Sequence, residues 1–77
     1  MSLDNLIQYR CRRGLLELDI ILLNFFDHHY RNLPQIQKKL FLELLELEDN
    51  DLLYMVQDSV NKNHKAYELI RLIINAK

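Results

Sequence analysis

The chain has 77 residues and a formal net charge of −1, and it contains one glycine, one proline and one cysteine. A chain of this length forms one domain, here residues 1–77, near the lower size limit for a free-standing hydrophobic core. Because turns and hairpins need far more glycine and proline, the composition excludes a β-rich fold and predicts an all-α protein. A net charge this close to zero excludes a general attraction to nucleic acid or anionic lipid.

The first half of the chain predicts two helices separated by its only glycine. Apolar residues at helical spacing indicate a first helix over residues 4–12, with Ser2 or Asp4 available as its cap. Gly14 then breaks or bends the path of the chain. A second helix is expected to end near Tyr30, and its nearly continuous apolar residues predict that it forms the buried centre of the domain. These apolar residues are Leu15, Leu16, Leu18, Ile20, Ile21, Leu22, Leu23, Phe25 and Phe26.

The second half of the chain predicts three more helices. Pro34 suits the first turn of a third helix, and the acidic run at residues 48–51 is expected to cap a short fourth helix. A fifth helix follows a loop at residues 61–64. Short connections imply antiparallel neighbours, so the expected fold is a compact five-helix antiparallel bundle. The residues expected to face its core are Ile36, Leu40, Phe41, Leu44, Leu45 and Leu47 in the third helix, Leu52, Leu53 and Val56 in the fourth, and Ala66, Leu69, Ile70, Ile73 and Ile74 in the fifth.

Cysteine usage and apolar segment lengths indicate the compartment. The single cysteine, Cys11, excludes an internal disulfide and fits a reducing environment. The N-terminal residues show no signal-peptide or transit-peptide pattern. The longest apolar-rich stretch, residues 15–26, is interrupted by two carboxylates, whereas a membrane span needs roughly 20 nearly uncharged residues. We therefore expect a cytoplasmic protein without direct membrane insertion.

Residue patterns typical of catalysis or of metal binding are missing from the sequence. It contains no Glu-x-x-His pair for a di-iron site and no Cys-x-x-Cys pair for zinc. His28 and His29 would point about 100° apart on a helix, so they cannot share one metal ion. A single glycine cannot build the phosphate-binding loop of a nucleotide site. We therefore expect no enzymatic activity, no metal site and no cofactor held by this chain.

Charged residues are distributed unevenly along the chain. Three arginines lie within residues 8–13, whereas residues 40–61 carry six acidic residues and no lysine or arginine. Three arginines form too small a basic patch for a helical reader of DNA, so no nucleic acid partner is expected. The asymmetry instead suits a protein that docks in a fixed orientation.

Three stretches, at residues 11–20, 25–30 and 44–52, closely resemble the SdhE family, also called YgfY or CptB. The likeness extends over roughly residues 5–75, and its core is the family's Arg-Gly-x-x-Glu motif, here Arg13, Gly14 and Glu17. The resemblance implies a five-helix assembly factor that binds the flavoprotein subunit of succinate dehydrogenase and promotes covalent attachment of FAD to it. Related members also act on fumarate reductase. In that case the FAD belongs to the partner and not to this chain.

The family name leaves one alternative function open. The name CptB carries a competing assignment, the antitoxin component of a toxin–antitoxin pair that acts by protein–protein binding. Both assignments describe a small binding protein without its own catalytic residues. We expect the free chain to be a monomer.

Each motif residue has an expected role in partner binding and a structural alternative. Arg13 offers a five-donor fork to acceptors on the partner, or it pairs with Glu17. Gly14 lets a partner backbone approach, or it only breaks the helix. Glu17 alternatively stabilises the start of the second helix through the helix dipole. Asp19 lies in an apolar helix, so its carboxylate should be exposed or hydrogen-bonded. His29 and Tyr30 border the docking surface, or they belong only to a solvent-exposed helix end. The residues expected to bind the partner are Arg13, Gly14, Glu17, Asp19, His29 and Tyr30.

Overall fold

The structure, a computed structural model, describes residues 2–59 and 61–76. Within these ranges it contains five α-helices and no strand, which confirms the predicted all-α class. A short 3₁₀ turn continues the second helix, and a π-helical stretch continues the fourth. The elements are α1 (Leu3–Arg10), α2 (Leu16–His29), the 3₁₀ turn (Tyr30–Asn32), α3 (Gln35–Leu45), α4 (Asp49–Tyr54), the π-helical stretch (Met55–Ser59) and α5 (Tyr67–Asn75).

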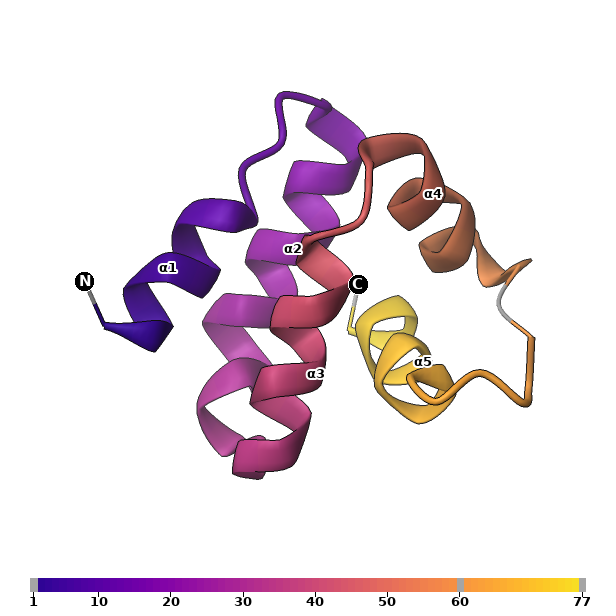
Figure 1. The fold of residues 1–77 in the computed structure, drawn as a ribbon. Helices are drawn as coiled ribbons and strands as arrows, with labels where there is room; N and C mark the ends of the chain where they lie inside the picture. The colour runs from indigo at the N-terminus through magenta and orange to yellow at the C-terminus, as the bar shows by residue number, and fades with distance from the viewer. Residues whose placement is uncertain (1, 60, 77) are drawn as a thin grey trace.

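The helices pack around a central antiparallel pair. α2 and α3 run in opposite directions through the middle of the molecule, with α1 on one side and α4 and α5 on the other (Figure 1). α1 packs against α3, and α5 packs against α2. The predicted helical bundle is therefore confirmed. Among the described residues, no helix is both long enough and apolar enough to cross a membrane.

The core lies between these helices and is built mainly from aliphatic side chains and two phenylalanines. Phe25 of α2 and Phe41 of α3 meet edge to face with their ring centroids 5.2 Å apart, a favourable arrangement for aromatic pairs. Both side chains are fully buried. The other buried residues are Ile7, Cys11, Leu18, Ile21, Leu22, Tyr30, Leu44, Leu45, Leu52, Val56, Ala66, Leu69, Ile70 and Ile73.

Local chemistry sets the helix starts close to their predicted positions. Ser2 caps α1, because its hydroxyl oxygen accepts a hydrogen bond from the backbone N–H of Asn5 at 3.1 Å. Pro34 stands directly before α3 rather than inside its first turn. Ala66, predicted within the last helix, stands directly before α5. These differences amount to one or two residues, the usual uncertainty of helix ends.

Two predictions about burial are wrong. α2 is not wholly buried, because Leu16 and Ile20 are 77% and 59% exposed and lie on the outer face of the helix. Ile36 of α3 is 78% exposed. It lies five residues before the buried Phe41, which on a helix with about 100° per residue places it about 140° away from the core-facing direction.

The acidic run before α4 does not cap that helix through its side chains, in contrast to the prediction. Glu48 occupies the N-cap position but makes no side-chain hydrogen bond to the helix. Asp49, the first residue of α4, instead binds a distant arginine, Arg13.

Candidate functional site

The connection between α1 and α2 contains a glycine with a positive φ angle. We call residues 11–15 the Gly14 bend. Gly14 adopts φ +87°, a conformation that costs other residues about 1–2 kcal/mol. A Cβ added at this position would meet no atom within 4 Å, so the space beside Gly14 is open. The predicted need for glycine at this break is therefore confirmed, and it arises from the backbone rather than from crowding.

The main chain of the bend is held by Asp19 from the first turns of α2. One carboxylate oxygen of Asp19 accepts the backbone N–H of Arg13 at 2.7 Å, and the other accepts the N–H of Gly14 at 3.2 Å. The expectation that this carboxylate is exposed or hydrogen-bonded is confirmed. Two consecutive N–H groups of the bend, which would otherwise lack acceptors, are satisfied by one side chain.

The side chain of Arg13 is held by acceptors at the end of α3 and the start of α4. Its Nε donates to Oδ1 of Asp49 at 2.7 Å, and its two terminal nitrogens donate to the backbone carbonyls of Leu45 and Leu47. We call this arrangement the Arg13 clamp. The Arg13 side chain is only 12% exposed. Its carboxylate partner is therefore Asp49 and not Glu17, which the sequence offered as the alternative. That Arg13 touches a binding partner stays a prediction.

The clamp provides hydrogen-bond partners for polar groups at the end of α3 and at the start of α4. Leu45 is the last residue of α3, so no backbone N–H of the helix donates to its carbonyl. A cation at a helix C-terminus also interacts favourably with the helix dipole. Asp49 is the first residue of α4, where the positive end of the helix dipole favours a carboxylate. Hydrogen bonds to charged groups contribute about 1.5–3 kcal/mol each. Arg13 therefore joins the α1–α2 connection to the α3–α4 connection, which lie far apart in the sequence.

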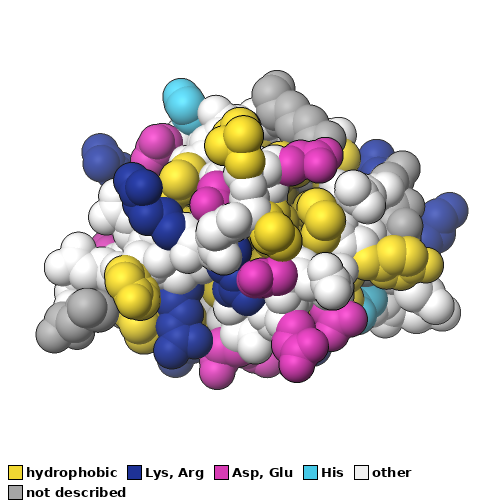
Figure 2. Space-filling view, turned by 90° about the horizontal axis from the view of Figure 1, so that it is seen from above, with side chains coloured by type: hydrophobic (Ala, Val, Ile, Leu, Met, Phe, Trp, Pro, Cys, Tyr) yellow, Lys and Arg dark blue, Asp and Glu magenta, His cyan; other side chains and the backbone are white. Residues whose placement is uncertain are grey.

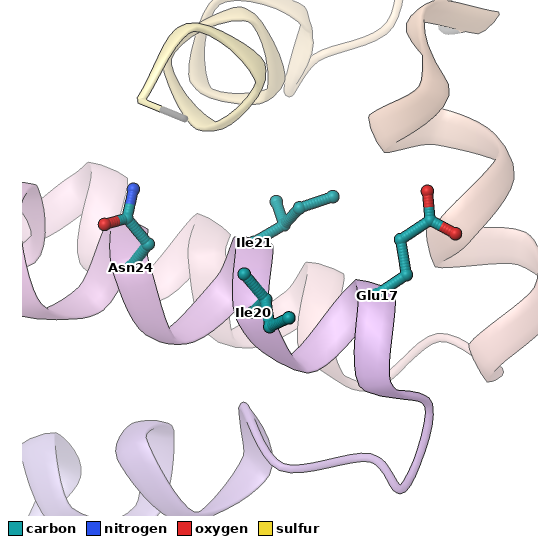
Figure 3. A pocket seen from close by; sticks show the side chains of 4 residues that line it. All are labelled: Glu17, Ile20, Ile21 and Asn24. Carbon is teal, nitrogen blue, oxygen red and sulfur yellow. The ribbon is translucent and has the colours of Figure 1, made fainter.

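The outer surface of the bend continues onto the exposed face of α2. Gly14, Leu15, Leu16 and Glu17 are consecutive and all exposed. Beside them lies a mostly apolar hollow of about 410 Å³, which we call the α2 groove. Figure 3 shows that its lining side chains come from one helix, with the carboxylate of Glu17 directed towards α4. The residues that line the groove are Glu17, Ile20, Ile21 and Asn24.

Charged and apolar groups surround the bend at this end of the molecule. Figure 2 looks onto the end where the α1–α2 connection and the start of α4 lie, and apolar atoms reach the surface there between basic and acidic side chains. A second hollow of about 340 Å³ lies over the Arg13 clamp, and its lining includes Arg10, Arg12 and Glu46. Such a mixed surface can supply both apolar burial and charge complementarity to a protein partner.

The structure does not bring His29 and Tyr30 to the bend. They lie at the other end of α2, about 18 Å along the helix from Glu17 at 1.5 Å per residue. His29 is exposed and stacks on Phe25 with ring centroids 5.6 Å apart. Tyr30 is only 3% exposed, and its hydroxyl donates to Asp4 at 2.7 Å. Tyr30 is therefore a core residue with a polar tip. A role for either residue in partner binding stays a prediction.

Cys11 begins the bend as a fully buried side chain. Burial raises the pKa of its thiol to about 12, although the charge of Arg13 acts in the opposite direction. Burial and the hydrogen bond to Asp4 also raise the pKa of Tyr30. Both groups are neutral when protonated, so the folded state favours the neutral forms.

Because the thiol pKa is higher in the folded state, the stability of the fold decreases as pH rises through the alkaline range. The contribution of Cys11 is fully present below the unfolded thiol's pKa of about 9 and is lost as pH rises towards the folded value of about 12. We expect the thermal midpoint of the wild-type chain to fall over this range more steeply than that of Cys11→Ala. Thermal melts followed by circular dichroism at several alkaline pH values measure the difference. Parallel curves for the two proteins would contradict it.

The bend combines fixed polar groups with exposed apolar side chains. Among the described residues, no three histidine, cysteine, aspartate or glutamate side chains gather as metal ligands. The thiol of Cys11 is buried and held neutral, so it is a poor nucleophile. The fold and the bend together define a small all-α protein with a fixed, solvent-facing loop at one end of its bundle.

Comparison with known proteins identifies its family. Residues 5–77 match the sequence model of a family described as flavinator of succinate dehydrogenase. The FAD assembly factor SdhE of Yersinia pseudotuberculosis is 36% identical over 76 residues, which cover 95% of this chain and 86% of that protein. Proteins of the same name from Photorhabdus laumondii and Pectobacterium atrosepticum are 36% and 37% identical, over 97% and 95% of this chain and 89% and 86% of theirs. The chain belongs to the flavinator family, and the resemblance to SdhE proteins is confirmed.

Proposed function

We propose that this protein is an FAD assembly factor that binds the flavoprotein subunit of succinate dehydrogenase and promotes covalent attachment of FAD to it. The observation that carries the proposal is the family match over residues 5–77. The relatives named FAD assembly factor align over nearly the whole chain, so the likeness involves the complete fold and not one motif.

The Gly14 bend supports a docking role at a defined place. Gly14 of the bend and Glu17 in the first turn of α2 are both exposed, next to Leu16 and the α2 groove. Exposed apolar side chains beside fixed polar groups are typical of protein interfaces. An open glycine also lets a partner's backbone approach without steric conflict.

In the proposed role this chain is a chaperone-like factor without catalytic residues. In this role the flavin and the residue to which it becomes attached belong to the flavoprotein, and this chain needs neither a cofactor nor a metal of its own. Its site would act by binding and by shaping the partner. The proposal includes a cytoplasmic location, a monomeric free state and a second client, the flavoprotein of fumarate reductase.

Deletion of the gene tests the proposal in the source cell. We expect the flavoprotein polypeptide still to be made but to carry much less covalent flavin, because its assembly factor is missing. In-gel flavin fluorescence at the flavoprotein band measures this, with immunodetection of the same band as the loading control. A plasmid copy of the wild-type gene should restore the signal.

The same strain separates the two functions that the sequence leaves open. Undiminished flavin fluorescence together with growth arrest by a co-encoded toxin would contradict the proposal and favour the antitoxin. The relatives compared above are named for FAD assembly and lend the antitoxin no support.

A further inference from the structure

We propose that Asp49 is a positioning residue for flavoprotein docking, and that it acts through Arg13 to hold the Gly14 bend in the shape that the partner recognises. This inference rests on the function proposed above and deepens it. It divides the site into residues that contact the partner and residues that hold the contact residues in position. Gly14 and Glu17 belong to the first group, whereas Arg13, Asp19 and Asp49 belong to the second.

The burial and the hydrogen bonds of Arg13 support this division. All three guanidinium nitrogens donate to acceptors within the chain, and the side chain is only 12% exposed. An arginine bound in this way has little left to offer a partner unless the clamp opens. In contrast, Gly14, Leu16 and Glu17 are exposed. The motif arginine therefore faces inward and the motif glycine and glutamate face outward.

Asp49 supplies the charge that fixes the clamp. Among the described residues its carboxylate forms the one ion pair to Arg13, at 2.7 Å. The other acceptors of the guanidinium are neutral carbonyls, those of Leu45, Leu47 and, at 3.4 Å, Arg10. All of these bonds have the cationic guanidinium as donor, but only the contact with Asp49 adds the attraction between two opposite charges. Without the carboxylate, the Arg13 side chain is less firmly held and the bend can sample other shapes.

Loss of this restraint lowers affinity even where no contact to the partner is removed. When only a fraction of the molecules has the binding-competent shape, the apparent affinity falls by that fraction. The backbone N–H groups of Arg13 and Gly14 report the shape, because both donate to Asp19 in the closed bend. Opening of the bend exposes these two amides to exchange with solvent while the core stays protected.

The experiment compares Asp49→Asn with Asp51→Asn in the full chain. Asp51 is an exposed residue on the same helix, so its substitution changes the charge equally and leaves the clamp intact. Affinity for the purified, flavin-free flavoprotein subunit is measured by calorimetry. We expect Asp49→Asn to weaken binding by at least tenfold and Asp51→Asn to bind as the wild type does.

Hydrogen exchange followed by NMR supplies the readout that a general loss of stability would not give. In Asp49→Asn we expect faster exchange at the amides of Arg13 and Gly14, with unchanged exchange at the buried residues Leu22 and Phe25 of α2. Faster exchange at all four amides would mean that Asp49 only stabilises the fold, and would overturn the inference.

A double-mutant cycle separates positioning from direct contact. Arg13→Lys keeps the positive charge but loses the planar fork, so a clamp role predicts the same loss of affinity as in Asp49→Asn. If both residues act through one clamp, the double variant should bind no more weakly than either single variant. Additive losses would show two independent partner contacts and overturn the inference.

The wild-type measurement distinguishes a failure of the Asp49 inference from a failure of the proposed function. If the wild type and Asp49→Asn bind the flavoprotein equally, the inference fails and the proposed function stands. If the wild type itself does not bind, the proposed function fails, and the inference that rests on it fails too.

Discussion

Gly14→Arg is expected to abolish binding to the flavoprotein while leaving the chain folded. The backbone cost of a non-glycine residue at φ +87° is about 1–2 kcal/mol, which a buried core of this kind can tolerate. Because a Cβ at this position meets no atom within 4 Å, the arginine side chain would extend outward over the surface of the bend. It would occupy the space through which we propose that a partner's backbone approaches.

Gly14→Ala is the matched control for this prediction, since it carries the same backbone strain with a minimal side chain. We expect both variants to melt cooperatively at midpoints lowered by a few degrees, and we expect only Gly14→Arg to lose binding completely. Circular dichroism and calorimetric titration with the flavoprotein subunit measure the two effects. Normal binding by Gly14→Arg would remove Gly14 from the interface, and complete unfolding would make the glycine purely structural.

Phe41→Ala is expected to unfold most of the protein. Phe41 is fully buried and lies against the rings of Phe25 and Tyr30. Truncation of a buried phenylalanine costs about 3–5 kcal/mol. A domain of 77 residues has only about 4–12 kcal/mol in total at the usual 0.05–0.15 kcal/mol per residue. One side chain therefore accounts for a large part of the stability.

Ile36→Ala on the same helix is the control, because Ile36 is 78% exposed. Urea unfolding followed by circular dichroism should show a midpoint for Ile36→Ala close to that of the wild type, whereas Phe41→Ala should be largely unfolded without urea. A shift of similar size in both variants would mean that α3 does not pack on the core as described.

The fold was predictable to a large extent because helical periodicity reports which residues can share a face. The periodicity of the last helix identified Leu69, Ile70 and Ile73, all of which are buried. It failed where an apolar residue lies on an outer face, as at Leu16 and Ile36, because hydrophobicity alone does not tell a core contact from an exposed apolar side chain. On α2, such exposed residues border the proposed docking surface.

The candidate site was predictable in its local part. A lone glycine between two helices indicated a special backbone conformation, and the cost of an unpaired carboxylate indicated that Asp19 is exposed or hydrogen-bonded. The link from Arg13 to Asp49 was not predictable, because the two residues lie 36 positions apart. The acidic run offers several carboxylates, and only the folded path of the chain from α3 into α4 brings this one to Arg13.

Covalent flavin loading in a purified system tests the central claim most directly. The flavin-free flavoprotein subunit of succinate dehydrogenase is incubated with FAD, with and without this chain, and covalent flavin is measured by fluorescence after denaturing electrophoresis. We expect the wild-type chain to accelerate the attachment, Gly14→Arg to match the reaction without any factor, and the chain incubated alone with FAD to gain no covalent flavin. An attachment rate that the wild-type chain leaves unchanged would contradict the account.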